Sequence, residues 1–259
     1  MILYSKIFGN GLPILVFHGL FGNGDNWISF AKKFSKNYQV HLVDIRNHGN
    51  SFSSKEMNYD LISKDILKYI NHYKLKNIIM LGHSMGGKAV MHFSLSYPLI
   101  PKKIIIVDIS PRAYLLNNNK NIIQILKNVN FNIINTRKDL NNFLKPFIKD
   151  IKIRSFFSKS TFIKKNGKLA FRFFLFGIEK NYFHLIQEKI NYSNTYNHPI
   201  LFLRGKNSNY ILNKDYSLIK KFFPKAEIII IKKSSHWIHI DNPIDFYKVI
   251  DNFLTLNKI

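Results

Sequence analysis

Residues 77–97 read NIIMLGHSMGGKAVMHFSLSY, and this stretch carries the strongest structural signal in the chain. An apolar run stops at Gly82, and a helical pattern begins directly after Ser84. A strand that becomes a helix over so few residues must bend sharply, and Gly82 and Gly86 leave room for the bend. The G-x-S-x-G pattern predicts that Ser84 is an exposed nucleophile beside a helix N-terminus. The alternative for these five residues is an ordinary serine helix cap.

Two later strand ends provide partners for such a serine. Asp108 follows the apolar run 104–107, and His236 follows the apolar run 228–231. Strands of a parallel sheet end at a common edge, so all three side chains are expected on the edge that holds Ser84. Their order along the chain is Ser, Asp, His, the order that accompanies a serine on a strand-to-helix elbow. The sequence therefore predicts a Ser84-His236-Asp108 triad.

Other residues compete for the roles of acid and base. The acid often follows the strand expected at 200–205, but the loop KNSNY at 206–210 has no carboxylate, and Asp215 already lies in an expected helix. This favours Asp108 as the acid. His48 is the rival base, but it precedes the nucleophile, and its loop 46–51 is interpreted as structural packing. His239 is interpreted as a packing or capping residue.

The loop at 18–23, HGLFGN, follows the buried apolar run 13–17. Glycine lets a backbone approach a reacting carbon closely, so this loop could supply one oxyanion donor. We assign this donor to the N–H of Leu20 and the second donor to the N–H of Met85, just past the nucleophile. A plain turn between strand and helix is the alternative for the loop.

Strand and helix patterns alternate up to residue 112 and resume at residue 197, which predicts an α/β fold with a mostly parallel, doubly wound sheet. We expect residues 1–112 and 197–259 to form one core and residues 113–196 to form an inserted helical cap over the active-site edge. Asp25 is expected to cap the first helix, and the run 227–231 to be a buried strand. Within the cap we expect a polar link at 117–120 and helices at 122–129, 140–148 and 182–190. The phenylalanines of the cap could wall the site or form the cap's own core; they are Phe156, Phe157, Phe162, Phe171, Phe173, Phe174 and Phe176.

Composition excludes several classes of site. The chain has no cysteine, which rules out disulfides, zinc–thiolate sites and a cysteine nucleophile. It carries 39 Lys and Arg against 15 Asp and Glu, but the lysines are scattered, which favours biased composition over nucleic-acid binding. The positive field could also attract an anionic substrate. No secretion signal or run of ~20 apolar residues is evident, so we expect no membrane span and a cytoplasmic protein.

Together these stretches resemble the α/β-hydrolase superfamily and, more narrowly, the YbfF-type bacterial esterase group with its mitochondrial relatives. The motifs that carry the resemblance are HGLFG at 18–22 with DNW at 25–27, VDIRNHG at 43–49, GHSMGGK at 82–88, VDISP at 107–111, FLRGKNS at 202–208 and HW at 236–237. The cap matches this group poorly.

The resemblance implies hydrolysis of a small-molecule carboxylic ester or acyl thioester, including acyl-CoA, without a metal or organic cofactor. It also agrees with Asp108 as the acid. Two other readings of the chain stay open. One is a carbon–carbon bond hydrolase or a cofactor-free haloperoxidase with the same triad, and the other is a non-catalytic binding module on this scaffold.

Overall fold

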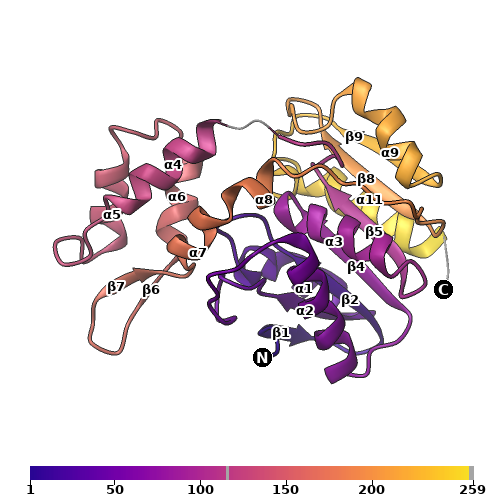
Figure 1. Ribbon diagram of the computed structural model, residues 1–259, viewed down its shortest axis with the longest axis horizontal. Coiled ribbons are helices and arrows are strands. Elements are labelled where there is room, and N and C mark those ends of the chain that lie inside the picture. Colours follow the sequence, from indigo (N-terminus) through magenta and orange to yellow (C-terminus); the bar gives the residue numbers. More distant parts are fainter. Residues whose placement is uncertain (115–116, 257–259) are drawn as a thin grey trace.

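A seven-stranded sheet forms the centre of the computed structural model, which describes residues 1–114 and 117–256 (Figure 1). The strand order is β1-β3-β2-β4-β5-β8-β9, with β1 antiparallel to β3 and every other pairing parallel. The strands are β1 (Ser5–Phe8), β2 (Leu12–Phe17), β3 (Tyr38–Val43), β4 (Ile78–His83), β5 (Pro101–Val107), β8 (Ile200–Gly205) and β9 (Ala226–Ile231). The predicted mostly parallel α/β sheet is confirmed.

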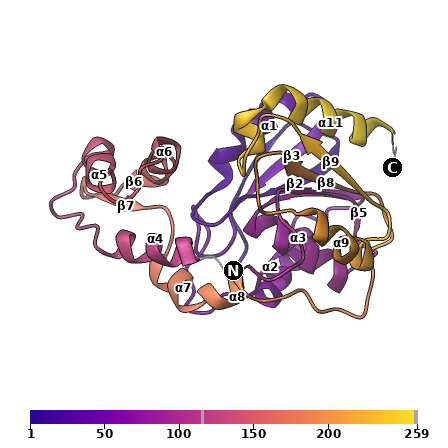
Figure 2. The ribbon, with the colours of Figure 1, turned by 90° about the horizontal axis from the view of Figure 1, so that it is seen from above.

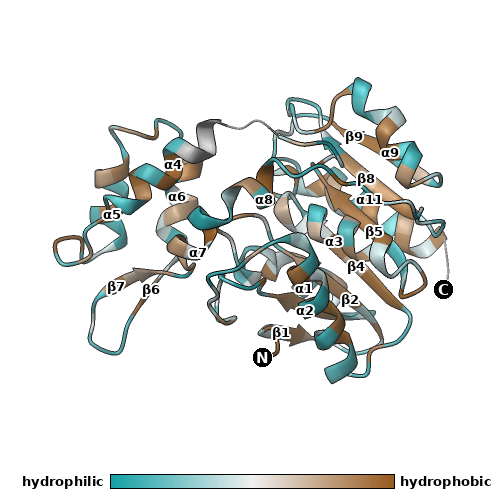
Figure 3. Cartoon of the chain, viewed as in Figure 1, coloured by the Kyte–Doolittle hydropathy of each residue, from teal (hydrophilic) through white to brown (hydrophobic). Residues whose placement is uncertain are grey.

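Helices cover both faces of this sheet, with α2, α3 and α9 on one side and α1 and α11 on the other (Figure 2). Successive strand residues point to opposite faces, so Leu15 joins the first apolar layer and Val16 the second. The central strands are therefore apolar over most of their length (Figure 3). The helices of the core are α1 (Ile28–Phe34), α2 (Tyr59–His72), α3 (Met85–Ser96), α9 (Tyr216–Phe222), α10 (Ile238–Asp241) and α11 (Pro243–Leu256). No helix within the described ranges is both long and apolar enough to cross a membrane.

Two expectations about the core are wrong. Asp25 does not cap the first helix, because Asn23 takes that place and accepts a hydrogen bond from the Asp25 N–H at the start of a 3-10 turn (Gly24–Trp27). The apolar run predicted as a buried strand is β9, the last strand of the sheet. With no strand beyond it, part of β9 faces solvent, and Ile230 is 43% exposed.

Most of the segment between β5 and β8 forms a lobe beside the sheet (Figure 1). The segment contains α4 (Asn117–Lys127), α5 (Arg137–Leu144), α6 (Ile151–Lys159), the hairpin β6 (Thr161–Ile163) and β7 (Leu169–Phe171), α7 (Leu175–Lys180) and α8 (Tyr182–Ile186). Its last helix, α8, lies against the core instead, where its Leu185 carbonyl accepts a hydrogen bond from the Tyr59 hydroxyl. The expected polar link at 117–120 is instead the first turn of α4. The last expected helix, 182–190, is only the short α8.

Neither α6 nor the β6–β7 hairpin was expected from the sequence. Helix α6 was not predicted because its β-branched and aromatic residues are equally compatible with a strand. The hairpin had a local signal in the pair Asn166-Gly167, and Gly167 takes the left-handed φ of 78° at the end of the turn, where its N–H donates to the Lys164 carbonyl.

The loop after β3 pairs directly with this lobe. The Gly49 N–H donates to the Arg172 carbonyl at 2.6 Å, and the Phe174 N–H donates to the Asn47 carbonyl at 2.8 Å. His48 and Phe173 face each other across an isolated antiparallel bridge. Backbone pairing of this kind fixes the lobe against the core, as the structural interpretation of loop 46–51 requires.

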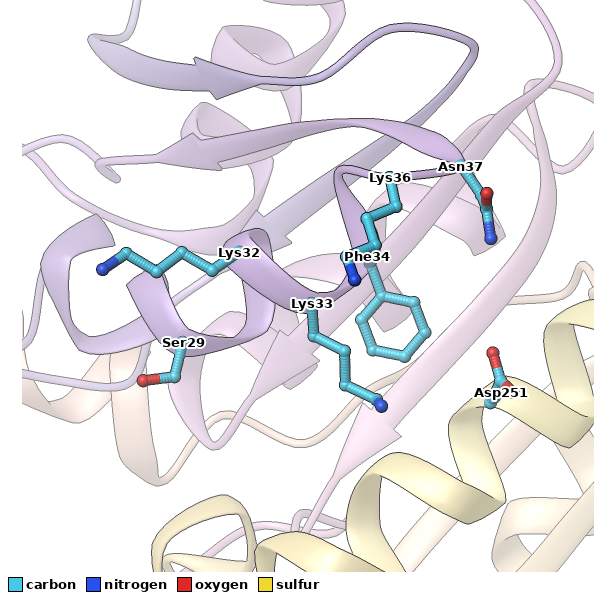
Figure 4. A pocket seen from close by; sticks show the side chains of 7 residues that line it. All are labelled: Ser29, Lys32, Lys33, Phe34, Lys36, Asn37 and Asp251. Carbon is cyan, nitrogen blue, oxygen red and sulfur yellow. The ribbon is translucent and has the colours of Figure 1, made fainter.

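A surface depression of about 560 Å³ lies between α1 and α11 (Figure 4). It contains three of the chain's many lysines and no residue predicted for the active site. The end of α1 that lines it leads into the start of β3, so it lies toward the amino edge of the sheet, opposite the edge where β4 and β5 end. Its lining consists of Ser29, Lys32, Lys33, Phe34, Lys36, Asn37 and Asp251.

Candidate active site

Ser84 occupies a sharp turn between β4 and α3. Its backbone has φ 53° and ψ −119°, a left-handed conformation that is unfavourable for any residue but glycine. The turn is held by the Ser84 N–H, which donates to the Val107 carbonyl at 3.1 Å. A Cβ on Gly82 would lie 2.3 Å from the Gly86 oxygen, and one on Gly86 would lie 2.3 Å from the Phe17 oxygen. Both glycines of the motif are thus required by packing at the turn.

Asp108 and His236 are in direct contact. Asp108 is fully buried at the end of β5, and its Oδ2 accepts a hydrogen bond from Nδ1 of His236 at 2.8 Å. The other oxygen, Oδ1, accepts from the Gly205 N–H at 3.0 Å. Since the ionised carboxylate can only accept, Nδ1 of His236 must carry the proton, and Nε2 is left free to act as a base.

Ser84 and His236 are brought to the same edge by different elements. His83, directly before Ser84, donates from Nε2 to the His236 carbonyl at 2.9 Å, and the two imidazole rings lie 4.7 Å apart. In this conformation no hydrogen bond joins the Ser84 hydroxyl to His236, judged over the residues that the structure describes. Catalytic hydrogen bonds are often long without substrate and tighten in the complex.

The two expected oxyanion donors lie beside Ser84. A Cβ on Gly19 would lie 3.4 Å from the Ser84 Cβ, so the loop that carries Leu20 passes directly against the serine. Met85 begins α3, where the first N–H groups have no partner within the helix. Neither the Leu20 nor the Met85 N–H donates a hydrogen bond to another described residue, so both are free to bind an oxyanion.

His48, the rival base, has no free ring nitrogen. Its Nε2 accepts from the Phe21 N–H at 3.1 Å, and its Nδ1 donates to the Arg46 carbonyl at 2.9 Å. In this way it holds the loop that carries Leu20. His18 also bonds to a backbone group, because its Nε2 accepts a hydrogen bond from the Ile45 N–H at 3.1 Å. Burial lowers the pKa of His48 to about 3 and that of His18 to about 4, so both stay neutral at pH 7.

These neutral histidines predict acid-sensitive stability. Burial lowers the pKa of His48 in the folded state, whereas histidine in the unfolded chain titrates near 6.5, so the unfolded state takes up the proton first. The contribution of His48 to the free energy of unfolding is therefore present above pH 6.5 and is lost as the pH falls from 6.5 toward 3. Between pH 7.5 and pH 5.5, the free energy of unfolding should fall by about 1.4 kcal/mol less in the His48→Gln variant than in the wild type. Urea unfolding followed by circular dichroism at both pH values measures this difference.

The control is His72→Gln, at the exposed C-terminal end of α2. This substitution should leave the loss of stability on acidification unchanged. An equal loss in His48→Gln and the wild type would mean that His48 takes up a proton while the protein remains folded.

The loop after β8 contains a contact that the sequence did not suggest. This loop lacks the acid often found there, but Ser208 donates a short hydrogen bond to Oδ2 of Asp108. Asp215, the nearest alternative acid, instead accepts from the Leu212 N–H at 2.8 Å and from Arg112 at 3.2 Å. Asp108, and not Asp215, therefore contacts the histidine.

Aromatic side chains of the inserted lobe reach both sides of the site. On α6, the Phe156 ring lies 5.7 Å from that of Trp237, beside His236, and Phe157 lies 5.6 Å from Phe21, beside Leu20. Phe173 lies 5.1 Å from Phe21. Phe157 and Phe173 are buried in the same apolar cluster as Phe21, and Phe156 is partly buried against it.

His239 stacks on Trp27 at 4.3 Å and lies 5.4 Å from His83, ring to ring, as expected of a packing residue. Over the described ranges, no three His, Asp or Glu side chains are grouped closely enough to hold a metal ion.

Known proteins are similar to this chain in fold and in sequence. Residues 13–243 match the family described as alpha/beta hydrolase fold. The chain is 34% identical to the sn-1-specific diacylglycerol lipase ABHD11 of Danio rerio over 253 residues, 95% of this chain and 79% of that protein. It is 29% identical to esterase YbfF of Escherichia coli over 246 residues, 95% of this chain and 94% of that one.

A solved structure titled "Marine microorganism esterase" superposes with a TM-score of 0.94 at 34% identity, covering 98% of this chain and 99% of that chain. The resemblance noted from the sequence motifs is thus confirmed. The chain belongs to the α/β-hydrolase fold family, and within it to the esterase/lipase type.

Proposed function

We propose that this protein is a serine hydrolase that cleaves carboxylic esters or acyl thioesters, including acyl-CoA, through Ser84, His236 and Asp108. The observation that carries the proposal is the 2.8 Å contact between Asp108 and His236, at the sheet edge where Ser84 occupies its strained turn. Strain of this kind is typical of functional sites.

The reaction begins when Nε2 of His236 takes the Ser84 proton and Oγ attacks the acyl carbonyl. Asp108 holds the imidazole through Nδ1 and stabilises the imidazolium that forms. The N–H groups of Leu20 and Met85 bind the tetrahedral oxyanion. His236 then protonates the leaving alcohol or thiol, and a water molecule activated by the same imidazole releases the acid from the acyl-enzyme.

We further propose that residues 113–196 act as a cap on a core made of residues 1–112 and 197–259. Support comes from Phe156 and Phe157, which reach the two loops on either side of Ser84. Apolar side chains at this place suit an acyl chain. The net charge of +24 suits a substrate that carries phosphates, such as coenzyme A.

Acyl-CoA hydrolysis can be measured cleanly on this protein. Released coenzyme A thiol is detected with Ellman's reagent, and the protein, which has no cysteine, adds no thiol of its own. We expect kcat/KM for an acyl-CoA to fall severalfold between about 0.02 and about 0.3 M salt, because the salt screens the attraction. For an uncharged p-nitrophenyl ester, kcat/KM should stay nearly constant.

The outcomes separate the parts of the proposal. Ester cleavage without thiol release would remove acyl-CoA from the substrate range, and thiol release insensitive to salt would remove the role of the positive field. Turnover of a vinylogous diketone or of a halide with peroxide, but of no ester, would favour carbon–carbon hydrolysis or haloperoxidase chemistry instead.

A further inference from the structure

The imidazole of His236 lies face to face with the ring of Tyr210. The ring centroids are 3.7 Å apart and the planes differ by 14°. This is close for an aromatic pair, since centroids 4.5–7 Å apart are usual. Asp108 holds the edge of the same imidazole at Nδ1. The ring that transfers the proton is thus held at its edge by one residue and at its face by another.

The backbone of Tyr210 is held by the residues that surround the acid. Its N–H donates to Oγ of Ser208 at 3.2 Å, and Ser208 in turn donates to Asp108. Its carbonyl accepts a hydrogen bond from the Tyr114 hydroxyl. Tyr114 also lies 5.4 Å from Tyr210, ring to ring. The position of Tyr210 relative to His236 is therefore fixed on both sides of the residue.

We propose that Tyr210 is a positioning residue that sets the plane of the His236 imidazole and stabilises its protonated form through the face of the phenol ring. The proposal rests on the proposed function, in which His236 becomes positively charged as it takes the Ser84 proton. The face of an aromatic ring carries negative charge density and attracts a cation at this distance. The attraction grows only as the imidazolium forms, so it lowers the barrier more than it strengthens substrate binding.

The phenol hydroxyl takes no part in this arrangement. Among the described residues it makes no hydrogen bond, and burial, with a smaller effect of Asp108, raises the pKa of Tyr210 to about 12. The aromatic face alone should then suffice. Phenylalanine keeps that face, whereas leucine fills a similar volume without it, so these two substitutions separate charge stabilisation from simple packing.

The test compares wild type, Tyr210→Phe and Tyr210→Leu in pH profiles of ester hydrolysis. Tyr210→Phe should retain most of kcat and the wild-type profile. Tyr210→Leu should lose about 3- to 30-fold in kcat with little change in KM, and the acidic limb of its kcat/KM profile should move to lower pH by about 0.5 to 1.5 units. The limb moves down because the protonated imidazole, the inactive form of the base, loses its stabilisation.

A second measurement does not depend on turnover. In a Ser84→Ala background, the NMR titration midpoint of the His236 imidazole should be lower in Tyr210→Leu than in Tyr210→Phe. Equal midpoints, or loss of kcat by Tyr210→Phe as large as by Tyr210→Leu, would overturn the proposal. Should Tyr210→Leu fail to fold, as judged by its thermal midpoint, Tyr210→Met replaces it.

Failure of the proposed function would be seen separately. A fluorophosphonate that does not label Ser84 of the wild type would reject the serine hydrolase. Normal labelling combined with unchanged titration in Tyr210→Leu would reject only the role of Tyr210.

Discussion

The Ser84→Ala variant is expected to lose roughly 10⁴- to 10⁶-fold in kcat for a short-chain p-nitrophenyl ester while keeping its fold. Alanine removes the attacking oxygen but retains the Cβ, so the packing around the turn is unchanged. The Ser84 side chain makes no capping hydrogen bond to α3 that could be lost. Activity assays and thermal unfolding on the same preparation measure both parts of this expectation.

A matched control for this variant is Ser53→Ala, which changes an exposed serine elsewhere. It should react with a fluorophosphonate like the wild type, giving the mass of one adduct, whereas Ser84→Ala should give none. An adduct on Ser84→Ala, or turnover close to that of the wild type, would move the nucleophile to another residue and remove the basis of the proposed mechanism.

The Asp108→Asn variant is expected to lose about 10⁴-fold in kcat. Oδ1 of Asp108 accepts a hydrogen bond from the Gly205 N–H. Because an N–H can only donate, the amide oxygen of asparagine, and not its NH₂ group, must occupy the position of Oδ1. The amide NH₂ then faces His236 and forces Nδ1 to accept. The proton moves to Nε2, and the imidazole can no longer take the proton of Ser84. Steady-state kinetics with circular dichroism as a check on folding measures this loss.

Asp215→Asn is the matched comparison, because Asp215 is also buried and is the alternative acid. It weakens the pairing with Arg112 and should cost about 1 to 3 kcal/mol in the free energy of unfolding, with kcat within a few-fold of the wild type. A large loss of kcat in Asp215→Asn together with an active Asp108→Asn would assign the acid to Asp215.

Features that depend on residues close together in the sequence could be predicted. Gly82, Ser84 and Gly86 lie within one turn, and their spacing, between an apolar run and a helical pattern, implies a sharp bend between strand and helix. The apolar strands could be recognised because strands buried on both faces lack polar positions. The lobe was harder, since short helices such as α6 have apolar patterns that also suit a strand.

Contacts between distant residues could not be predicted in this way. Ser208 meets Asp108 across 100 residues, and His83 meets the His236 carbonyl across 153. Tyr210 stacks on His236 because the loops after β8 and β9 lie side by side, as their strands do. No local spacing encodes such pairs.

The amino-acid sequence by itself determined the order of strands and helices in the core, the sharp turn at Ser84 and the edge of the sheet to which Asp108 and His236 belong, because periodicity and turn chemistry act over a few residues. Only the tertiary structure decided that Asp108 contacts His236, that both ring nitrogens of His48 bond to backbone groups, and that Tyr210 stacks on the His236 imidazole. Those relations depend on how separate loops pack against one another, and packing is settled by the whole folded chain.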